Sequence, residues 1–479
     1  MNRRQFLSTS AAVAAIPAGE ASTIAIGSRR ELFVDRFLID KLTNASLRLQ
    51  QPRREDTALL LDRPWEGAFS NYATVLQDGG EYRLYYRGLP QAGKDGTAAE
   101  TTSYAVSKDG KHFTRPDLGL FEYEGSRKNN LILAGMPPFS SDFSPMIDTR
   151  PGVPPDQRYK ALAGTRTSGL VAFQSADGIR WTKMREEPVF RDGVFDSQNL
   201  AFWSAAENEY VMYFRTLKTV GSKRYRWISR TTSDDFLTWA GPTEMTFGDA
   251  PPEHLYTNQT HPYFRAPHIY IALAARFMPG RQVLSDDEAR ALGVIPGYYK
   301  DCADAVLLTS RGGTSYDRTF LEAFLRPGLG VENWVSRNNY PVLNTVQTGK
   351  DELSFYTVSN YGQPGTHIRR YSLGLDRFAS VNAPYAGGEV VTKPLTFSGS
   401  RLLLNFSTSA PGGIRAEIQD EAGRPIPGFM LDDSVEVIGD QIEREVRWKN
   451  SPSLAALANK PIRLRLVLKD ADVFALRFA

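Results

Sequence analysis

Cysteine and histidine are scarce in this 479-residue chain, which has one cysteine and five histidines. The lone Cys302 cannot form a disulfide within the chain and has no second thiol with which to build a zinc cluster. No histidine and aspartate spacing is typical of a transition-metal site, and neither a Gly-x-Ser-x-Gly nor a Walker sequence is present. The sequence therefore gives little support to acyl or phosphoryl transfer, and we expect no metal-dependent chemistry and no required cofactor.

Charge of one sign and long apolar runs are also lacking. Acidic and basic residues nearly balance, with a formal net charge of +3, and no basic arm suggests a nucleic-acid partner. No stretch approaches the roughly 20 apolar residues of a membrane helix, so we expect no membrane insertion.

The N-terminus has the order of a twin-arginine export signal. Arg3 and Arg4 precede Phe6, Leu7 and a short alanine-rich run. We expect residues 1–21 to form a signal peptide and the mature protein to be periplasmic or secreted.

Turn residues and aromatics are abundant, with 39 glycines, 29 prolines and an aromatic share of 11%, which is typical of many strands and turns. A turn motif recurs five times, formed by a serine, an acidic or glycine-rich turn and a following aromatic residue. Its copies occupy residues 107–113, 175–181, 233–239, 310–316 and 372–378. The first serines of successive copies lie 68, 58, 77 and 62 residues apart, which suits one four-stranded propeller blade per copy.

Two apolar strands precede each turn motif, so each unit contains strands A, B and C and a less regular outer strand D. Five such units predict an all-β fold, with a five-bladed β-propeller over residues 30–385. We expect residues 31–35 to complete the last blade and close the ring. Beyond this region the turn motif disappears and alternating strands follow, which predicts a C-terminal β-sandwich over residues 386–479.

Five repeats followed by a sandwich resemble the glycoside hydrolases of families 32, 43 and 68, which include invertases, arabinanases and levansucrases. The chain also resembles a large group of exported planctomycete-type proteins over essentially its whole mature length. The segments that carry this second resemblance are 31–35, 64–67, 195–199, 337–340 and 387–394. The hydrolase motifs Asn-Asp-Pro-Asn, Arg-Asp-Pro and Glu-Cys are absent. The resemblance therefore implies fold and substrate class, and it assigns no catalytic residue.

Glycoside hydrolysis usually needs a carboxylic acid that protonates the leaving oxygen and a carboxylate that acts as base or nucleophile. In a propeller, strand A lines the channel, and the D-to-A and B-to-C connections share the face where ligands enter. Asp196 is the first catalytic candidate because it begins an apolar inner strand, and an aspartate that caps its own turn is the structural alternative. Further catalytic candidates, each with a surface ion pair as the alternative, are Glu100, Glu66 and Asp304.

Other polar groups are predicted at the same face, where they would bind sugar hydroxyls beside a stacking tryptophan. For each histidine among them, a buried and satisfied side chain is the alternative. A long loop over residues 277–302 is predicted to fold over a ligand, and a structural calcium ion in the channel is compatible with the sequence. The predicted substrate-binding residues are Trp65, Asn71, Arg87, Asp142, Arg215, His254, Asn258, His261, Arg276, Arg337, Asn338, Tyr361 and His367.

Two functions fit these observations, and both have a carbohydrate as the partner. The first is an exo-acting glycoside hydrolase with paired carboxylates in the propeller funnel. Arg87, Arg215 and Arg276 end strand B of their blades, with Arg166 and Arg337 nearby, which would suit an anionic sugar; ion pairs with neighbouring acids are the alternative. The second function is a noncatalytic glycan-binding protein whose carboxylates are structural.

Overall fold

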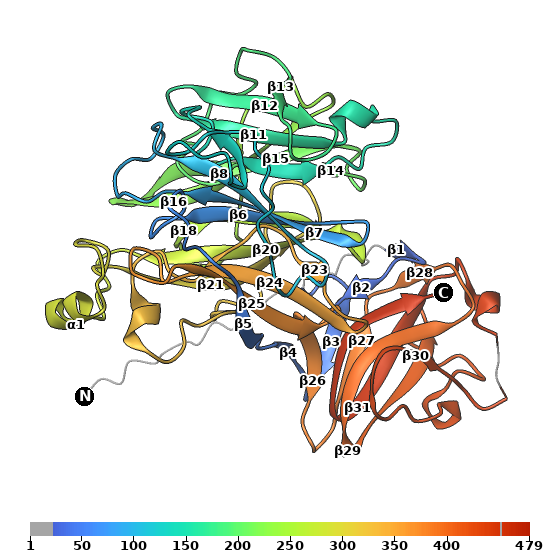
Figure 1. Cartoon of the computed structure of the whole chain (residues 1–479). Helices are drawn as coiled ribbons and strands as arrows, with labels where there is room; N and C mark the ends of the chain where they lie inside the picture. Colours follow the sequence, from blue (N-terminus) through green and yellow to red (C-terminus); the bar gives the residue numbers. More distant parts are fainter. Residues whose placement is uncertain (1–22, 451–452) are drawn as a thin grey trace, which may run out of the picture.

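The computed structural model describes residues 23–450 and 453–479, so the predicted signal peptide lies outside the described residues. Figure 1 shows a ring of sheets and a smaller β domain beside it. The predicted all-β fold, a five-bladed propeller followed by a sandwich, is confirmed. In the part of the chain that the structure describes, no helix is long and apolar enough to cross a membrane.

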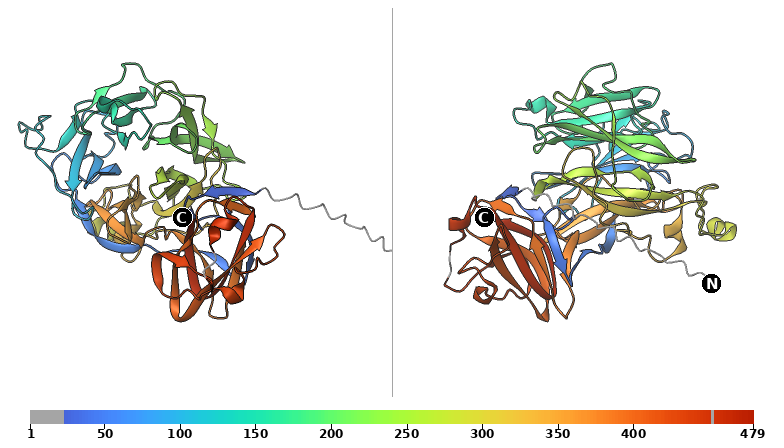
Figure 2. Two further views of the ribbon diagram at one scale, coloured as in Figure 1. Left: turned by 90° about the vertical axis from the view of Figure 1, so that its right-hand side faces the viewer. Right: turned by 180° about the vertical axis from the view of Figure 1, so that it is seen from behind.

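Each blade is an antiparallel sheet, and the left view of Figure 2 shows the blades arranged around a common centre. Blade 1 contains β6 (Asn71–Asp78), β7 (Glu81–Gly88), β8 (Thr101–Ser107) and β9 (Leu131–Ala134). Blade 2 contains β10 (Ser144–Ile147), β11 (Tyr159–Thr165), β12 (Gly169–Ser175) and β13 (Thr182–Lys183). Blade 3 contains β14 (Leu200–Ser204), β15 (Glu209–Val220), β16 (Lys223–Ser233) and β17 (Thr243–Glu244).

Blades 4 and 5 have short inner strands. Blade 4 contains β18 (His254–Thr257), β19 (Thr260–Tyr263), β20 (Ala266–Met278) and β21 (Cys302–Ser310). Blade 5 contains β22 (Tyr340–Pro341), β23 (Val346–Gln347), β24 (Glu352–Ser359), β25 (His367–Gly374) and β5 (Arg53–Leu60). Side chains of neighbouring blades share continuous apolar clusters, so each blade buries its faces against the next.

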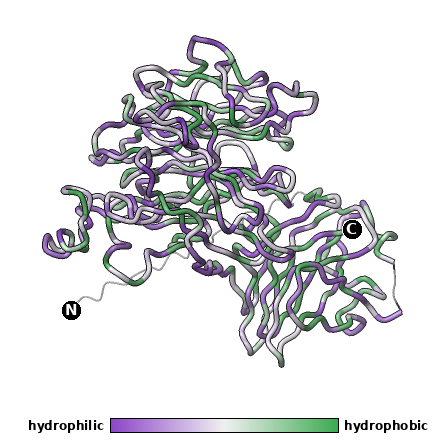
Figure 3. Tube along the Cα trace, viewed as in Figure 1, coloured by the Kyte–Doolittle hydropathy of each residue, from purple (hydrophilic) through white to green (hydrophobic). Residues whose placement is uncertain are grey.

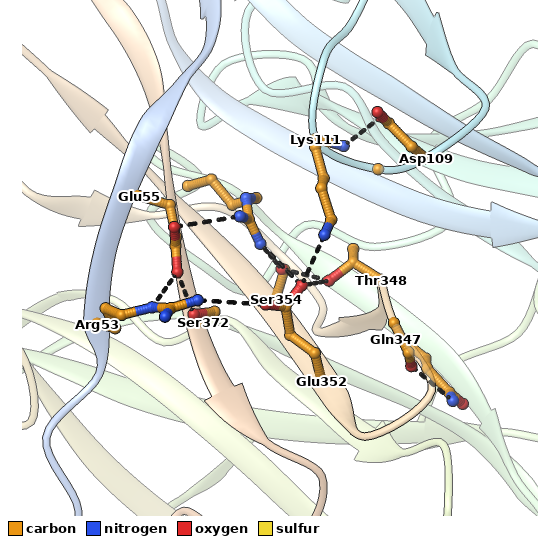
Figure 4. Close-up of polar contacts among 12 residues, drawn as sticks. Arg53, Glu55, Asp109, Lys111, Gln347, Thr348, Glu352, Ser354 and Ser372 are labelled. Atoms are coloured by element: carbon orange, nitrogen blue, oxygen red, sulfur yellow. Dashed lines mark hydrogen bonds and ion pairs between the residues drawn. The ribbon is translucent and has the colours of Figure 1, made fainter.

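The ring is closed by β5, which pairs with β25. Figure 4 shows the polar contacts at this closure, where Ser372 donates to Glu55 at 2.5 Å and Lys111 of blade 1 pairs with Glu352 of blade 5 at 3.3 Å. The prediction that residues 31–35 close the ring is wrong.

Residues 31–35 lie instead between the two domains. β2 (Glu31–Leu32) pairs with β31 (Ile462–Phe478) of the C-terminal sheet. Phe33 packs into the core of the C-terminal domain, whereas Leu32 and Val34 pack into a cluster shared with blades 4 and 5. Successive side chains of an extended segment point to opposite faces, and here the two faces pack against different domains.

The turn motifs have the structural role that was predicted. In the first copy, Ser107 Oγ accepts a hydrogen bond from the Gly110 amide at 2.9 Å, and Asp109 accepts two more from the amides that follow it, at 2.7 and 3.0 Å. The same contacts recur in the copies at 175–181 and 233–239. Burial raises the pKa of Asp109, but these amide hydrogen bonds outweigh it and hold the pKa below the ordinary value.

The C-terminal domain is one continuous sheet whose long strands enclose a single apolar core. Its C-terminal strands are β26 (Ala379–Ala383), β27 (Gly388–Thr392), β28 (Leu395–Phe397), β29 (Leu402–Asp420), β30 (Asp440–Val446) and β31. Its N-terminal strands are β1 (Ile24–Gly27), β2, β3 (Ile39–Thr43) and β4 (Ser46–Leu49). The domain thus includes residues before 386, because β4 pairs with β26 and β3 with β27. Figure 3 shows hydrophobic stretches along strands of both domains.

Helical turns are short and lie in loops. They are α1 (Asp286–Ala291), η1 (Pro155–Gln157), η2 (Val331–Trp334), η3 (Leu431–Asp433) and η4 (Leu454–Leu457). α1 belongs to the long loop between β20 and β21 and projects from the ring in Figure 1. Backbone hydrogen bonds from Ile295 to Gly362 (2.8 Å) and from Ser336 to Tyr298 (2.9 Å) hold the loop against blade 5. The loop therefore lies beside the channel mouth.

Candidate functional site

A cavity of about 440 Å³ lies at the propeller face that carries the D-to-A and B-to-C connections, and we call it the ligand-side cavity. Its volume is in the range of small-molecule sites. All five blades contribute side chains to it. In blade order these are Tyr72 and Arg87, Asp142 and Arg166, Asp196 and Arg226, Tyr256 and Tyr298, and Arg337 and Tyr361. Of the residues predicted from sequence, Arg87, Asp142, Asp196, Arg337 and Tyr361 line this cavity.

Two buried amides cross the channel beneath the ligand-side cavity. Gln259 Nε2 donates to Gln198 Oε1 at 2.8 Å and to the Pro341 backbone oxygen at 2.7 Å. Gln198 Nε2 donates to Thr74 Oγ1 at 2.7 Å. These contacts join blades 1, 3, 4 and 5 across the channel. Asp196 and Tyr256, which precede the two glutamines, line the ligand-side cavity, whereas Thr260 and His261, which follow Gln259, line a cavity at the opposite channel mouth. The buried amides thus lie between the two cavities along the inner strands.

Asp142 is the buried carboxyl group of the cavity. Asp142 lies just before β10, the inner strand of blade 2. Blades 1 and 4 have asparagines at the corresponding place, Asn71 and Asn258, whose Oδ1 atoms accept backbone hydrogen bonds. Asp142 is 2% exposed, and its Oδ1 has no hydrogen-bond partner among the described residues. Burial raises the pKa of Asp142 well above its ordinary value; the charges of Arg87 and Arg215 oppose this effect, and those of Glu100 and Asp196 add to it. Asp142 therefore keeps its proton at a pH where an ordinary aspartate has lost it.

Asp196 is an exposed carboxylate of the cavity, as is Asp95. It lies in the loop before β14, and its side chain is 66% exposed. Arg215 Nη1 lies 2.8 Å from Asp196 Oδ1, and Arg215 Nη2 donates to the backbone oxygen of Tyr256 at 2.9 Å. Because Arg215 is buried directly behind the cavity wall, it holds Asp196 in a fixed position beside blade 4.

Arg87 has its charge matched by two acids. Its Nη1 lies 2.9 Å from Asp95 and 3.3 Å from Glu100, and its Nη2 donates to the backbone oxygen of Phe69 at 2.9 Å. Glu100 is buried behind Arg87 and does not line the cavity. Burial raises the pKa of Glu100, although Arg87 and a backbone amide oppose this effect. Glu100 is thus the buried partner of Arg87, and no part of it faces the cavity.

Three other arginines of the cavity, Arg166, Arg226 and Arg337, form no ion pair with any carboxylate that the structure describes. The guanidinium carbon of Arg226 lies 4.8 Å from the ring centroid of Tyr256, and that of Arg337 lies 5.2 Å from the centroid of Tyr298. Stacking on aromatic faces leaves the N–H groups at the guanidinium edge available. These forks suit a carboxylate or a sulfate, which accepts two hydrogen bonds from one guanidinium.

Four tyrosines form much of the cavity wall. Tyr298 comes from the loop that was predicted to fold over a ligand, and its ring packs against Phe69 at 4.9 Å and Tyr361 at 6.0 Å. Asn338 Oδ1 accepts a hydrogen bond from the Tyr361 amide at 2.7 Å and so positions this wall. Aromatic faces of this kind stack on the apolar faces of sugar rings.

Three residues with a left-handed backbone lie at the same cavity. Tyr72, Phe195 and Arg337 have φ angles of 50°, 50° and 59°, in the left-handed region that non-glycine residues rarely adopt. All three line the ligand-side cavity. Such residues persist where the surrounding structure imposes them, and they are common at functional sites.

Glu66 lies outside the cavity in a buried ion pair. It accepts hydrogen bonds from the Tyr86 hydroxyl at 2.6 Å, from Arg115 Nε and Nη2 at 2.7 and 2.8 Å, and from the Arg63 amide at 2.9 Å. Its neighbour Trp65 donates to Asn130 at 2.9 Å and does not line the cavity. Glu66 thus stabilises blade 1 and is not brought together with Asp196.

Asp304 and Arg276 form an ion pair with two contacts of 2.6 and 2.9 Å, and Glu253 binds Arg276 at 3.0 Å. None of the three lines the ligand-side cavity. The ion-pair alternative therefore describes this cluster.

The three predicted binding histidines are hydrogen-bonded and have lowered pKa values because of burial. His261 contacts the Gln259 backbone oxygen and Thr345 Oγ1 at 2.9 and 3.1 Å, has a pKa of about 4, and lines a cavity at the opposite channel mouth. Strand A runs through the channel, so a residue at its far end reaches the other face. His254 accepts from the Arg226 amide at 3.2 Å, and His367 contacts the Gly365 backbone oxygen at 2.8 Å.

The sequence analysis missed several residues of this cavity. Tyr72 directly follows the predicted Asn71, and Tyr256 lies two residues before the predicted Asn258, but neither tyrosine was among the candidates. Arg226 lies in the second strand of the long β15–β16 hairpin of blade 3, whose length the blade spacing alone does not reveal. The described residues contain no group of three or more His, Cys, Asp or Glu side chains placed to hold a metal ion.

Comparison with solved structures gives likenesses of low sequence identity and low TM-score. No protein-family model and no curated protein matches it. A solved structure described as a glycoside hydrolase has 9% identity and a TM-score of 0.44, covering 67% of this chain and 92% of its own. An N-acetylgalactosamine deacetylase from F. plautii has 13% identity and a TM-score of 0.43, covering 70% and 96%. A fructofuranosidase from Schwanniomyces occidentalis has 11% identity and a TM-score of 0.38, covering 89% and 97%. At these values the likeness carries no conclusion about the activity of this chain.

Proposed function

We propose that the protein is an exo-acting glycoside hydrolase that releases a terminal anionic sugar from a polysaccharide or oligosaccharide. One observation carries this proposal: two carboxyl groups in opposite states share the ligand-side cavity. Asp142 is buried and keeps its proton to a higher pH than an ordinary aspartate, whereas Asp196 is exposed and paired with Arg215. Glycosidases usually use one protonated carboxyl group as the acid and one ionised carboxylate as base or nucleophile, and the surroundings of the two groups set this difference in protonation.

Asp142 is the general acid in this scheme. Its unpartnered Oδ1 and raised pKa suit transfer of a proton to the leaving oxygen as the glycosidic bond breaks. Asp196 accepts a hydrogen bond from the water that completes hydrolysis. The buried amides of Gln198 and Gln259 lie between this cavity and the opposite channel mouth, so a chain end fits the cavity better than a segment that would continue through the channel, which supports exo action.

The anionic substrate follows from charge. With Asp142 protonated, five guanidinium groups and three carboxylates lie at the cavity or directly behind its wall, which leaves a surplus of two positive charges. The guanidiniums belong to Arg87, Arg166, Arg215, Arg226 and Arg337, and the carboxylates to Asp95, Glu100 and Asp196. Of the arginines predicted for this task, Arg276 binds acids elsewhere, whereas Arg166 and Arg337 form no ion pair among the described residues, and neither does Arg226, which was not predicted. A uronic acid or a sulfated sugar would supply the complementary charge.

Release of reducing ends from a panel of uronic-acid-containing, sulfated and neutral glycans tests the proposal. We expect turnover of a charged glycan, and loss of that turnover in Asp142→Asn and Asp196→Asn with the fold retained. Binding on a carbohydrate array without turnover by the wild-type protein would favour the alternative, a noncatalytic glycan-binding propeller. Twin-arginine export to the periplasm or medium, and a structural calcium ion, stay predictions.

A further inference from the structure

Tyr256 is surrounded by positive charge to an extent that no other tyrosine of the ligand-side cavity shares. Its ring centroid lies 4.1 Å from the guanidinium carbon of Arg215, 4.8 Å from that of Arg226 and 5.7 Å from that of Arg337. Tyr72 is stacked by Arg87 alone, at 4.5 Å. The three guanidiniums come from blades 3 and 5 and converge on a strand of blade 4, so the arrangement depends on the closed ring.

The charged and titratable neighbours of Tyr256 decide where a proton resides. Burial and the charge of Asp196 raise the pKa of Tyr256, but Arg215 and Arg337 outweigh them and hold it below the ordinary value of 10.0. For Tyr72 the balance is reversed, because burial, Tyr256 and Asp142 together raise its pKa well above the ordinary value. Two neighbouring groups, Tyr72 and Asp142, therefore hold their protons more tightly than ordinary residues, while Tyr256 releases its proton more readily.

We propose that Tyr256 is the covalent nucleophile of the hydrolysis, with Asp142 as acid and base, so that the anomeric configuration is retained. This inference rests on the proposed function. The surplus of two positive charges at the cavity accommodates both a phenolate and one anionic substrate group. Some retaining glycosidases use a tyrosine in place of the usual carboxylate nucleophile.

The reaction balances with water as the other reactant. In the first step the Tyr256 phenolate oxygen bonds to the anomeric carbon, the bond from this carbon to the leaving oxygen breaks, and Asp142 gives its proton to that oxygen. In the second step a water held by Asp196 attacks the anomeric carbon and gives a proton to Asp142. The bond to Tyr256 breaks, and its electron pair restores the phenolate.

A first test needs no substrate. Ultraviolet difference spectroscopy follows phenolate formation, and we expect one tyrosine of the wild-type protein to ionise below pH 10. This ionisation should be absent in Tyr256→Phe and should move to higher pH in Arg337→Met. Tyr340→Phe is the matched control, because its ring packs 5.1 Å from that of Tyr256 and its hydroxyl has no hydrogen-bond partner among the described residues. Persistence of the early ionisation in Tyr256→Phe would overturn the assignment.

A second test uses the glycan that the wild-type protein hydrolyses. Proton NMR should show the first product with retained configuration, and Tyr256→Phe should lower kcat by at least about 100-fold while Tyr340→Phe leaves it unchanged. Azide should restore turnover to Tyr256→Ala and give a glycosyl azide of inverted configuration. An inverted hydrolysis product, or azide rescue of Asp196→Ala instead, would overturn the inference. If no glycan is turned over, the proposed function fails, and the titration still judges Tyr256 separately.

Discussion

Arg215 lies 2.8 Å from the carboxylate of Asp196 and also donates to the backbone oxygen of Tyr256 at 2.9 Å. One buried guanidinium thus fixes an exposed acid of blade 3 to the inner strand of blade 4. Its charge acts on both groups, since it stabilises the Asp196 carboxylate and lowers the pKa of Tyr256. The polar chemistry of the cavity is therefore distributed over several blades, and single substitutions should separate the roles.

The first prediction concerns proton donation by Asp142. Asp142→Asn should lower kcat on a natural glycan by at least about 100-fold, because the amide keeps the shape but cannot donate an acidic proton. On an aryl glycoside of the same sugar with a good leaving group, the loss of kcat/KM should be small, since such an oxygen departs without protonation and kcat/KM reports the steps up to its departure. The measurement is kcat/KM on both substrates, and an equal loss of kcat/KM on both would exclude Asp142 as the acid.

The same variant should change how stability depends on pH. The folded protein holds the Asp142 proton above the ordinary pKa, so above that pH the folded state binds more protons than the unfolded state. Stability of the wild-type protein should therefore fall as pH rises from the ordinary aspartate pKa toward the folded pKa. Asp142→Asn should lack this decline, as measured by urea unfolding from pH 4 upward. Parallel pH profiles for both proteins would contradict the assigned burial effect.

Much of the fold was predictable because the turn motifs are local. Ser107 and Asp109 bind amides within five residues of themselves, so a short stretch of sequence is enough to identify each blade. Ring closure was not predictable in the same way. The strand that closes the ring, β5, pairs with residues more than 300 positions away, and residues 31–35 have an equally apolar pattern that packs between domains.

The site was only partly predictable, because strand position tells which face a residue approaches but not what already binds it. Asp304 and Glu66 have suitable positions, yet Arg276 and Arg115 occupy their oxygens. Asp142 was assigned to substrate binding because its burial and missing partner appear only in three dimensions. In the sequence, Tyr256 is an ordinary aromatic residue of a strand. The three arginines that surround it come from other blades, so their approach is visible only in the structure.

Glu66 provides a prediction of the opposite kind. Glu66→Gln should lower the free energy of unfolding by about 2 kcal/mol, because it removes the buried charge that binds Arg115 and leaves only the exposed Asp62, 3.4 Å away, as its charged partner. The kcat of the folded enzyme should stay within about twofold of wild type. Thermal unfolding and kcat measured together on Glu66→Gln and Asp142→Asn should give crossed results, with stability lost in one variant and turnover in the other. A loss of kcat in both at unchanged stability would return Glu66 to the catalytic candidates.

The final prediction uses Arg166 to separate recognition of charge from catalysis. Arg166 is exposed at the cavity, has no ion pair among the described residues and is not one of the arginines that surround Tyr256. Arg166→Met should raise KM for the anionic glycan by about tenfold, the size of one lost charge-assisted hydrogen bond, with little change in kcat. Added salt should raise KM more for the wild-type protein than for the variant. The matched control is Arg185→Met, which removes the same charge from an exposed site in blade 2 where the guanidinium binds only backbone oxygens. Arg185→Met should leave KM unchanged, which would exclude an effect of net charge.

On a carboxyl-reduced or desulfated form of the glycan, the Arg166 variant and the wild-type protein should have the same KM and kcat. If the wild-type protein turned over that neutral form as well as the charged one, the surplus of guanidinium groups would not serve substrate recognition.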